Sequence, residues 1–218
     1  MGKSRAGILG NWRGRTGNVV ARQSQGRTIY SIYQPEVKDA KSSAQLAQRA
    51  RFSMLAQLAG LFRVAIKNTF KGLDGYETGT FQSAFVGYNS KIDGIFTGTY
   101  PNQAVDFEKL AVSYGNAFLP SGIAAEASES AIGVTWTDES VVGDDDGPQA
   151  NDLVYLVVYN PDKKRVVGAV PVARSVRRIV RPYPNSWEGD TLHAYLYVQS
   201  IKDETMYSQT YYLGDFEG

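Results

Sequence analysis

The second half of the chain is a regular succession of short apolar segments separated by turn residues. Apolar residues alternate with small or polar ones over residues 132–136, and residues 153–159 form an almost continuous apolar run. Further segments follow at residues 165–172, 177–181, 192–199 and 206–213. Roughly six short strands, rich in aromatic and β-branched residues, are typical of a β-sandwich. We therefore expect an immunoglobulin-like or fibronectin-like sandwich over residues 121–218, without the cysteine pair of a true immunoglobulin domain.

Residues 36–120 show a different pattern, with apolar residues three and four positions apart. This spacing predicts a long helix that begins at Ser43 and ends before Gly72, and a shorter helix within residues 80–95. Residues 105–114 read as a strand that leads out of this helical region. The sequence thus predicts an α+β fold that is mainly β.

Residues 1–35 contain six glycines, six basic residues and no acid, together with only short apolar pieces. Short strands joined by glycine turns fit this composition better than a helix does. Ordering a segment costs about 1 to 2 kcal/mol of backbone entropy per residue, which so little apolar surface cannot offset. We therefore expect an extended, basic, glycine-rich arm that becomes ordered on a partner.

Charge is distributed unevenly along the chain. Residues 1–72 carry thirteen Lys or Arg against two acids, a net charge of +11, whereas residues 73–218 carry ten against twenty, a net charge of −10. A cationic segment on an anionic body can neutralise phosphates, or it can dock on the acidic surface of a neighbouring copy. Both interpretations describe a binding protein rather than an enzyme.

The basic residues of this first third are the first group of candidate contact residues. At roughly 100° per residue, four of the five bases of the long helix fall within an arc of about 80°, which is either an ordinary solvated face or an interaction stripe. The candidates are Arg13, Arg15, Arg22 and Arg27 in the arm and Arg49, Arg63, Lys67 and Lys71 in the helix.

Tyrosine forms the second group, since the chain contains fourteen. Strand alternation favours outward positions for Tyr195, Tyr197, Tyr207 and Tyr211. Tyrosine suits interfaces because it brings a large contact area and a polar tip. An exposed tyrosine-rich sheet indicates subunit packing or ligand contact, unless these rings simply cover the second sheet.

The sequence offers little for catalysis. His193 is the only histidine, and it lacks the partners of a metal site or catalytic triad, so we expect a surface or sheet-edge imidazole. The glycines of residues 10–17 lack the Gly-Lys-Ser/Thr ending of a phosphate loop, and residues 144–147 do not match an EF-hand. We expect no enzyme activity, no cofactor, no metal and no small-molecule substrate.

The sequence shows neither a signal-peptide pattern nor a membrane-span pattern. The apolar stretch near the N-terminus is too short for a signal peptide, and no apolar run approaches a membrane span. We therefore expect no membrane partner and a protein that is made and used in a cytoplasm or inside a particle.

Several short segments carry a resemblance that covers nearly the whole chain. They lie, in order, at residues 7–10, 15–20, 44–52, 98–101, 134–138, 187–190 and 212–214. Together they resemble an uncharacterised family found in Bacteroidota and in their crAss-like tailed phages. The family has no defined activity and supplies no catalytic residues. The phage context implies a virion component of the tail or of the rings below the portal.

Three functional hypotheses follow. The first is a structural virion protein, assembled in the bacterial host cytoplasm, whose basic arm docks by β-augmentation on the acidic sandwich of a neighbour to form a ring or tube with itself and other virion proteins. The second is a nucleic-acid-binding accessory protein that uses residues 1–72, with Trp12 stacking on a base. The third is a receptor-binding or carbohydrate-binding β module that uses the tyrosine-rich face.

Overall fold

The computed structural model divides the chain into two units, residues 1–42 and residues 43–218. It describes residues 13–24, 26–36, 39, 41–73, 79–128, 130–141, 143, 146–168 and 170–218. The proposed stacking residue Trp12 and the carboxylates of Asp144 and Asp145 lie outside the described residues. The two units are described separately below.

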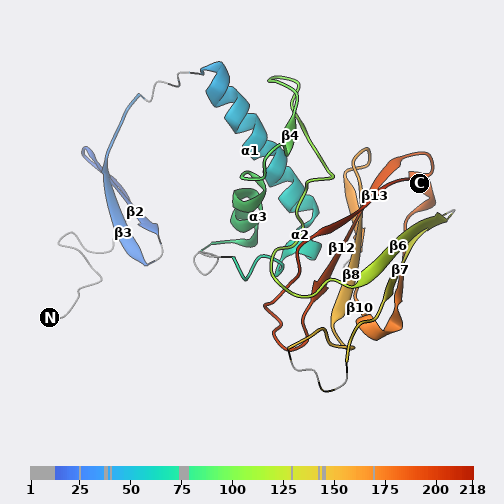
Figure 1. Ribbon diagram of the computed structural model, residues 1–218. Helices are drawn as coiled ribbons and strands as arrows, with labels where there is room; N and C mark the ends of the chain where they lie inside the picture. Colours follow the sequence, from blue (N-terminus) through green and yellow to red (C-terminus); the bar gives the residue numbers. More distant parts are fainter. Residues whose placement is uncertain are drawn as a thin grey trace. The chain divides into compact units, whose positions relative to one another are not determined.

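The N-terminal unit contains a three-stranded antiparallel sheet in the order β1-β2-β3. Its strands are β1 (Gly14–Thr16), β2 (Val19–Ser24) and β3 (Arg27–Ile32). Gly17 and Gly26 lie in the two tight turns with φ angles of 58° and 72°, which glycine adopts without steric cost. The predicted short strands joined by glycine turns are therefore present, and β2 and β3 are the blue strands of Figure 1.

The second unit is built on two antiparallel sheets that pack face to face. The larger sheet has the order β10-β8-β12-β13, with β9 also paired to β8, and the smaller sheet has the order β11-β7-β6. The larger sheet comprises β8 (Leu153–Asn160), β9 (Arg165–Gly168), β10 (Val172–Ala173), β12 (Thr191–Gln199) and β13 (Tyr211–Glu217). The smaller sheet comprises β6 (Ser121–Ser128), β7 (Ala131–Thr137) and β11 (Arg178–Pro182). This arrangement is a β-sandwich.

The core between the two sheets follows from strand alternation. Side chains of β12 point alternately to opposite faces, so Leu192 and Leu196 enter the sandwich core together with Ile132 of β7 and Leu156 of β8. Trp187, in the short 3-10 helix η3 (Asn185–Trp187), closes this core and is almost fully buried. The apolar side chains of the predicted alternating segment, residues 132–136, thus lie in one core.

Three helices cover the opposite face of the larger sheet (Figure 1). They are α1 (Ser43–Leu61), α2 (Arg63–Ile66) and α3 (Phe81–Asn89), and Thr80 caps α3 through a capping box with Ser83. Phe62, between α1 and α2, is fully buried, and its ring centroid lies 5.1 Å from that of Tyr159 and 6.0 Å from that of Tyr195. The helices and the sandwich therefore share the larger sheet, with one core on each side of it.

The predicted strand over residues 105–114 is wrong. Only β5 (Ala104–Val105) is a strand, and it pairs with β4 (Phe96–Thr97). Part of the following backbone is satisfied by side chains instead of a ladder. Asn89 accepts from the Ala111 amide at 2.9 Å and donates to the Ala111 carbonyl at 3.0 Å. Because both backbone groups of Ala111 have partners, the segment does not need sheet pairing.

Other element boundaries also differ from the predictions. The long helix ends at Leu61 and continues as the short α2, and α3 spans only residues 81–89 of the predicted 80–95. The last strand lies at residues 211–217 rather than 206–213, because Tyr207 forms only an isolated bridge with Gln199.

Candidate interaction surfaces

The N-terminal sheet gathers its arginines on one face, together with Val20 and Ile29. The cross-strand register places Arg15 opposite Val20 and Arg22 opposite Ile29, while Arg27 pairs with Ser24. Since side chains alternate along a strand, these three arginines share one face. Arg13 lies next to β1, and all four arginines are exposed. Within the part of the chain that the structure describes, none of the four forms an ion pair.

A local contact fixes the orientation of Arg15. Its guanidinium carbon lies 3.5 Å from the centroid of the Tyr33 ring, and its Nε donates to the Gly17 carbonyl at 2.9 Å. The Tyr33 amide in turn donates to the Asn18 carbonyl at 2.7 Å. Such cation–π stacking contributes about 0.5 to 1 kcal/mol at an exposed site. The arginine face is thus partly preorganised.

The opposite face of the same sheet carries no charged residue and is apolar at one end. Val19 pairs with Ile32, and Ala21 pairs with Tyr30. Ile32 is 79% exposed and Tyr30 is 37% exposed, so the sheet leaves much of this surface in contact with water. We call this the apolar face of the N-terminal sheet. An exposed apolar face of this kind is typical of an interaction site.

The predicted basic stripe of the long helix is spread over three segments. Arg49 lies in α1, Arg63 in α2, and Lys67 and Lys71 in the turns that follow, and all four are exposed. The calculated arc assumed a single straight helix, and this geometry ends at Leu61. The four residues are solvent-facing, but they do not lie on one helix.

Three of the four predicted interface tyrosines are buried, so their predicted exposure is wrong. Tyr195, Tyr197 and Tyr207 face the helices and are at most 4% exposed. The sequence pattern correctly gives their side of the strand, but the helical layer covers that side. Burial raises the pKa of Tyr195 and of Tyr197 well above 10, and raises the pKa of Tyr207 to about 12. Only Tyr211, which is 41% exposed, remains available to a partner.

His193 also differs from its predicted position at the surface or the sheet edge. It lies on β12, between β8 and β13, and its Nδ1 shares a 2.8 Å hydrogen bond with the Tyr212 hydroxyl. Its ring centroid is 4.8 Å from that of Phe107. Burial lowers the pKa of His193, and the nearby Asp215 and Asp106 oppose this shift. The imidazole is a half-buried packing residue.

One edge of the larger sheet is open. β13 pairs with β12 on one side, and among the described residues no strand pairs with its other side. Asp215 and Glu217 lie opposite His193 and Thr191, which places both carboxylates on the face that the helices partly cover. Both are exposed. We call this strand with its carboxylates the acidic edge.

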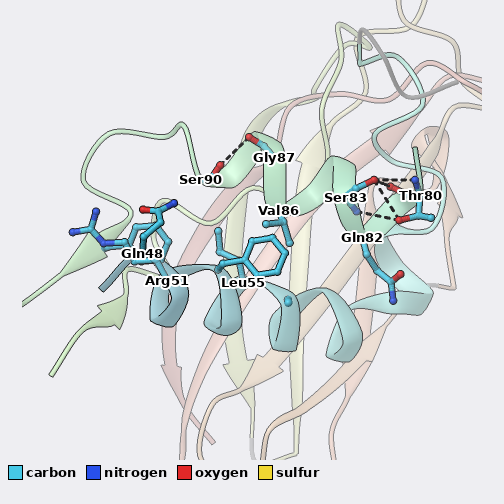
Figure 2. Close-up of a pocket in the computed structure, with 12 residues that line it drawn as sticks. Gln48, Arg51, Leu55, Thr80, Gln82, Ser83, Val86, Gly87 and Ser90 are labelled. Carbon is cyan, nitrogen blue, oxygen red and sulfur yellow. Dashed lines mark hydrogen bonds between the residues drawn. The ribbon is translucent and has the colours of Figure 1, made fainter. Parts of the chain in front are cut away.

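A groove between α1 and α3 is a further surface, which the sequence did not reveal. It has a volume of about 460 Å³, and Figure 2 shows Leu55 of α1 and Val86 of α3 facing each other across it. Phe52 on its border is 61% exposed, and the Arg51 guanidinium lies 5.3 Å from the Phe96 ring centroid. The only signal in the sequence was the apolar spacing of α1.

The described residues contain no group of three or more His, Cys, Asp or Glu side chains that could hold a metal ion. None of the helices in the described ranges is long and apolar enough to span a membrane.

The architecture defines an α+β protein, mainly β, whose sandwich carries a helical layer on one face. By sequence, the chain belongs to a family of unknown function, DUF6266, whose model matches residues 10–214. No curated protein matches the chain. Among solved structures, it is similar to the fn3 domain of human collagen alpha-1(XX) chain, at 10% identity and a TM-score of 0.35, over 48% of this chain and 88% of that one. The sandwich itself is established by the strand pairing described above.

Proposed function

We propose that this protein is a non-enzymatic assembly protein, which forms homo-oligomers when the N-terminal sheet of one copy docks on the second unit of a neighbour. The observation that carries the proposal is the two-faced N-terminal sheet, with Ile32 exposed on one face and arginines on the other. β1 and β3 are the outer strands of this sheet among the described residues.

The charge distribution also favours the second unit of a neighbouring copy as the partner of the N-terminal sheet. Residues 1–42 carry eight Lys or Arg against two acids, a net charge of +6, whereas residues 43–218 carry fifteen against twenty, a net charge of −5. Opposite net charges steer two surfaces together and accelerate their encounter. Contact of one unit with the other unit of a neighbouring copy is heterologous, and such contacts produce rings or open tubes.

The setting follows from the resemblance to the family of Bacteroidota and crAss-like phages. We propose that the ring or tube is part of a phage virion, in the tail or next to the portal, and that other virion structural proteins contact it. Protein mass spectrometry of purified particles, with antibody labelling of the assembled ring, tests this location.

The assembly itself is tested by measuring the mass of the full chain in solution. We expect a discrete large oligomer by light scattering, and a monomer for a variant that lacks residues 1–34. The shortened variant retains both cores of the second unit, and circular dichroism checks that it is folded. Oligomers that persist without residues 1–34 would exclude the N-terminal sheet as the assembly element.

A second candidate, nucleic-acid binding, is favoured by one specific observation. Arg15, Arg22 and Arg27 share one face of the N-terminal sheet without acidic partners among the described residues. The major groove of a DNA duplex admits a two-stranded β-ribbon such as that of β2 and β3, and arginines contact phosphates. Binding of duplex DNA should then weaken steeply as salt rises, and replacing the three arginines with glutamine should flatten that dependence.

A further inference from the structure

The groove between α1 and α3 has the size of a small-molecule site. Its volume of about 460 Å³ lies within the range of about 300 to 1,000 Å³ that is usual for ligand pockets. The part of α1 that lines it runs from Gln48 to Ala56, a length of roughly 12 Å. A stable protein interface buries about 800 Å² on each side, far more than the walls of so short a groove provide. The groove therefore suits a small ligand.

The middle of the groove is apolar. Leu55 of α1 and Val86 of α3 face each other there (Figure 2), and both side chains are buried in the helical layer. Phe52 also lines the groove and leaves 61% of its surface in water. A ligand that covers this ring gains free energy by removing apolar surface from water. The body of the ligand is therefore apolar.

The hydroxyl groups around the groove already have partners within the protein. Thr80 and Ser83 bond to each other in the capping box of α3, and the Ser90 hydroxyl donates to the Gly87 carbonyl at 3.1 Å, as the dashed lines in Figure 2 show. Among the described residues that line the groove, Arg51 is the only charged side chain. Recognition of a polar head group therefore depends mainly on Arg51.

Neutral groups hold Arg51 in place at one end of the groove. Its guanidinium carbon lies 5.3 Å from the centroid of the Phe96 ring. The hydrogen-bond network orients the amide of Gln103 so that its oxygen accepts from the Arg51 Nε at 2.8 Å and from the Nη2 at 3.2 Å, while its nitrogen donates to the Ala47 carbonyl at 3.2 Å. The guanidinium is thus preorganised without a carboxylate.

The remaining donors of Arg51 select the charge of the ligand. A guanidinium has five N–H donors, so three are left after the two bonds to Gln103. Within the described part of the chain, Arg51 forms no ion pair and no acid lines the groove. Hydrogen bonds from arginine to a carboxylate are roughly twice as strong as neutral ones. A carboxylate would therefore complete the bonding of Arg51.

We propose that the groove between α1 and α3 binds an amphipathic carboxylate, with the apolar chain between Leu55 and Val86 and the carboxylate on Arg51. The site belongs to the second unit and uses no residue of the N-terminal sheet. The inference therefore goes beyond the proposed assembly function and does not depend on it.

A chain-length series tests the class of ligand. Octanoate, decanoate and dodecanoate, each below its micelle concentration, are titrated into the full chain by isothermal titration calorimetry. We expect one site per chain and a dissociation constant that falls up to about fourfold for each added methylene, until the ligand outgrows the groove. Decanol has no charge and should bind at least about tenfold more weakly than decanoate. If no carboxylate binds, or if decanol binds as tightly, the proposal is wrong.

Substitution of Arg51 tests the head-group contact. Arg51→Gln should raise the dissociation constant of decanoate at least about tenfold, and Arg51→Lys should retain part of the affinity because it keeps the charge. Arg63→Gln is the matched control, since Arg63 is an exposed base in α2 that does not line the groove. Equal losses in Arg51→Gln and Arg63→Gln would mean that only the general charge attracts the ligand, and would overturn the assignment.

Substitution of Ala56 tests the apolar part of the groove. Ala56 lines the groove from an exposed position on α1, so Ala56→Glu should leave the fold intact, as circular dichroism checks. The added carboxylate should repel the ligand and abolish decanoate binding. Ser53→Glu, at an exposed position of α1 outside the groove, should leave binding unchanged. Decanoate binding that survives Ala56→Glu would place the ligand elsewhere.

The same titration, followed by light scattering, separates this inference from the proposed function. If the full chain remains a monomer but binds decanoate at this site, the assembly function fails and the ligand site stands. If decanoate binding and oligomer formation exclude each other, an apolar segment of a neighbouring copy occupies the groove and the ligand assignment is wrong.

Discussion

The hydroxyl of Tyr197, in the middle of β12, donates a 2.9 Å hydrogen bond to the carbonyl oxygen of Ala65 in α2. The neighbouring Tyr195 donates similarly to the Phe107 carbonyl at 2.8 Å. Both rings are buried, so the tyrosine-rich face of the sheet holds the helical layer and the segment after β5 in place. Tyr195 and Tyr197, which suggested an external contact surface, are structural.

Removing the Tyr197 hydroxyl should therefore destabilise the second unit. Tyr197→Phe keeps the ring but leaves the Ala65 carbonyl without this donor, and we expect a loss of about 1 kcal/mol in the free energy of unfolding. Chemical denaturation measures it. Tyr211→Phe is the control, since Tyr211 is partly exposed, and it should change stability little. Equal losses in the two variants would contradict this account.

The buried ion pair of Asp152 and Arg174 should show strong coupling. The Arg174 Nε lies 3.6 Å from the Asp152 Oδ2, its Nη2 donates to the Phe118 carbonyl, and the Arg174 side chain is fully buried. Asp152 also accepts from the Ile201 amide at 3.1 Å and from the Gln149 amide at 2.9 Å. Removing one partner leaves a buried charge unpaired.

We expect Asp152→Ala to cost about 3 to 5 kcal/mol of unfolding free energy. The double variant with Arg174→Met should be less destabilised than the sum of the two single changes, because it removes both charges together. A double-mutant cycle by denaturation measures the coupling. Strictly additive losses would mean that the interaction between the two side chains adds nothing to the free energy of unfolding.

Acid should weaken the fold through His193. Burial lowers its folded-state pKa below the usual 6.5, so the unfolded chain takes up the proton first as pH falls. The contribution of His193 is complete above the unfolded-state pKa and is lost as pH falls below about 6.5. The midpoint temperature of thermal unfolding should decline as pH falls through this range, and His193→Gln should reduce that decline. An unchanged slope in that variant would exclude His193 as its source.

High pH should destabilise the fold through its buried and half-buried tyrosines. The folded-state pKa values of Tyr207 and Tyr212 are raised to about 12, above the ordinary value of 10. The unfolded chain therefore loses these protons first, and stability present below pH 10 is lost as pH rises towards 12. The near-ultraviolet absorbance of tyrosinate should show one group of tyrosines that ionises normally and another that ionises only with unfolding. A single transition near pH 10 in the folded protein would contradict the burial.

Periodicity was a reliable guide where a single local pattern determined the element. The alternation over residues 132–136 and the apolar run at 153–159 are strands β7 and β8, and the helical spacing after Ser43 is α1. It failed over residues 105–114 because Asn89 and Thr210 satisfy that backbone from distant positions. Of the candidate surfaces, the sequence located the four arginines, but it could not show the open edge at β13.

The sequence by itself determined the class of fold, the short strands of residues 14–32 and the separation of basic and acidic segments. These depend on local spacing, turn residues and composition, which act within a few residues along the chain. Only the tertiary structure decided that Tyr195 and Tyr197 are covered by helices, that Arg15, Arg22 and Arg27 share one face, and that β13 is open. Burial and strand pairing depend on segments far apart in the sequence, so no local pattern contains them.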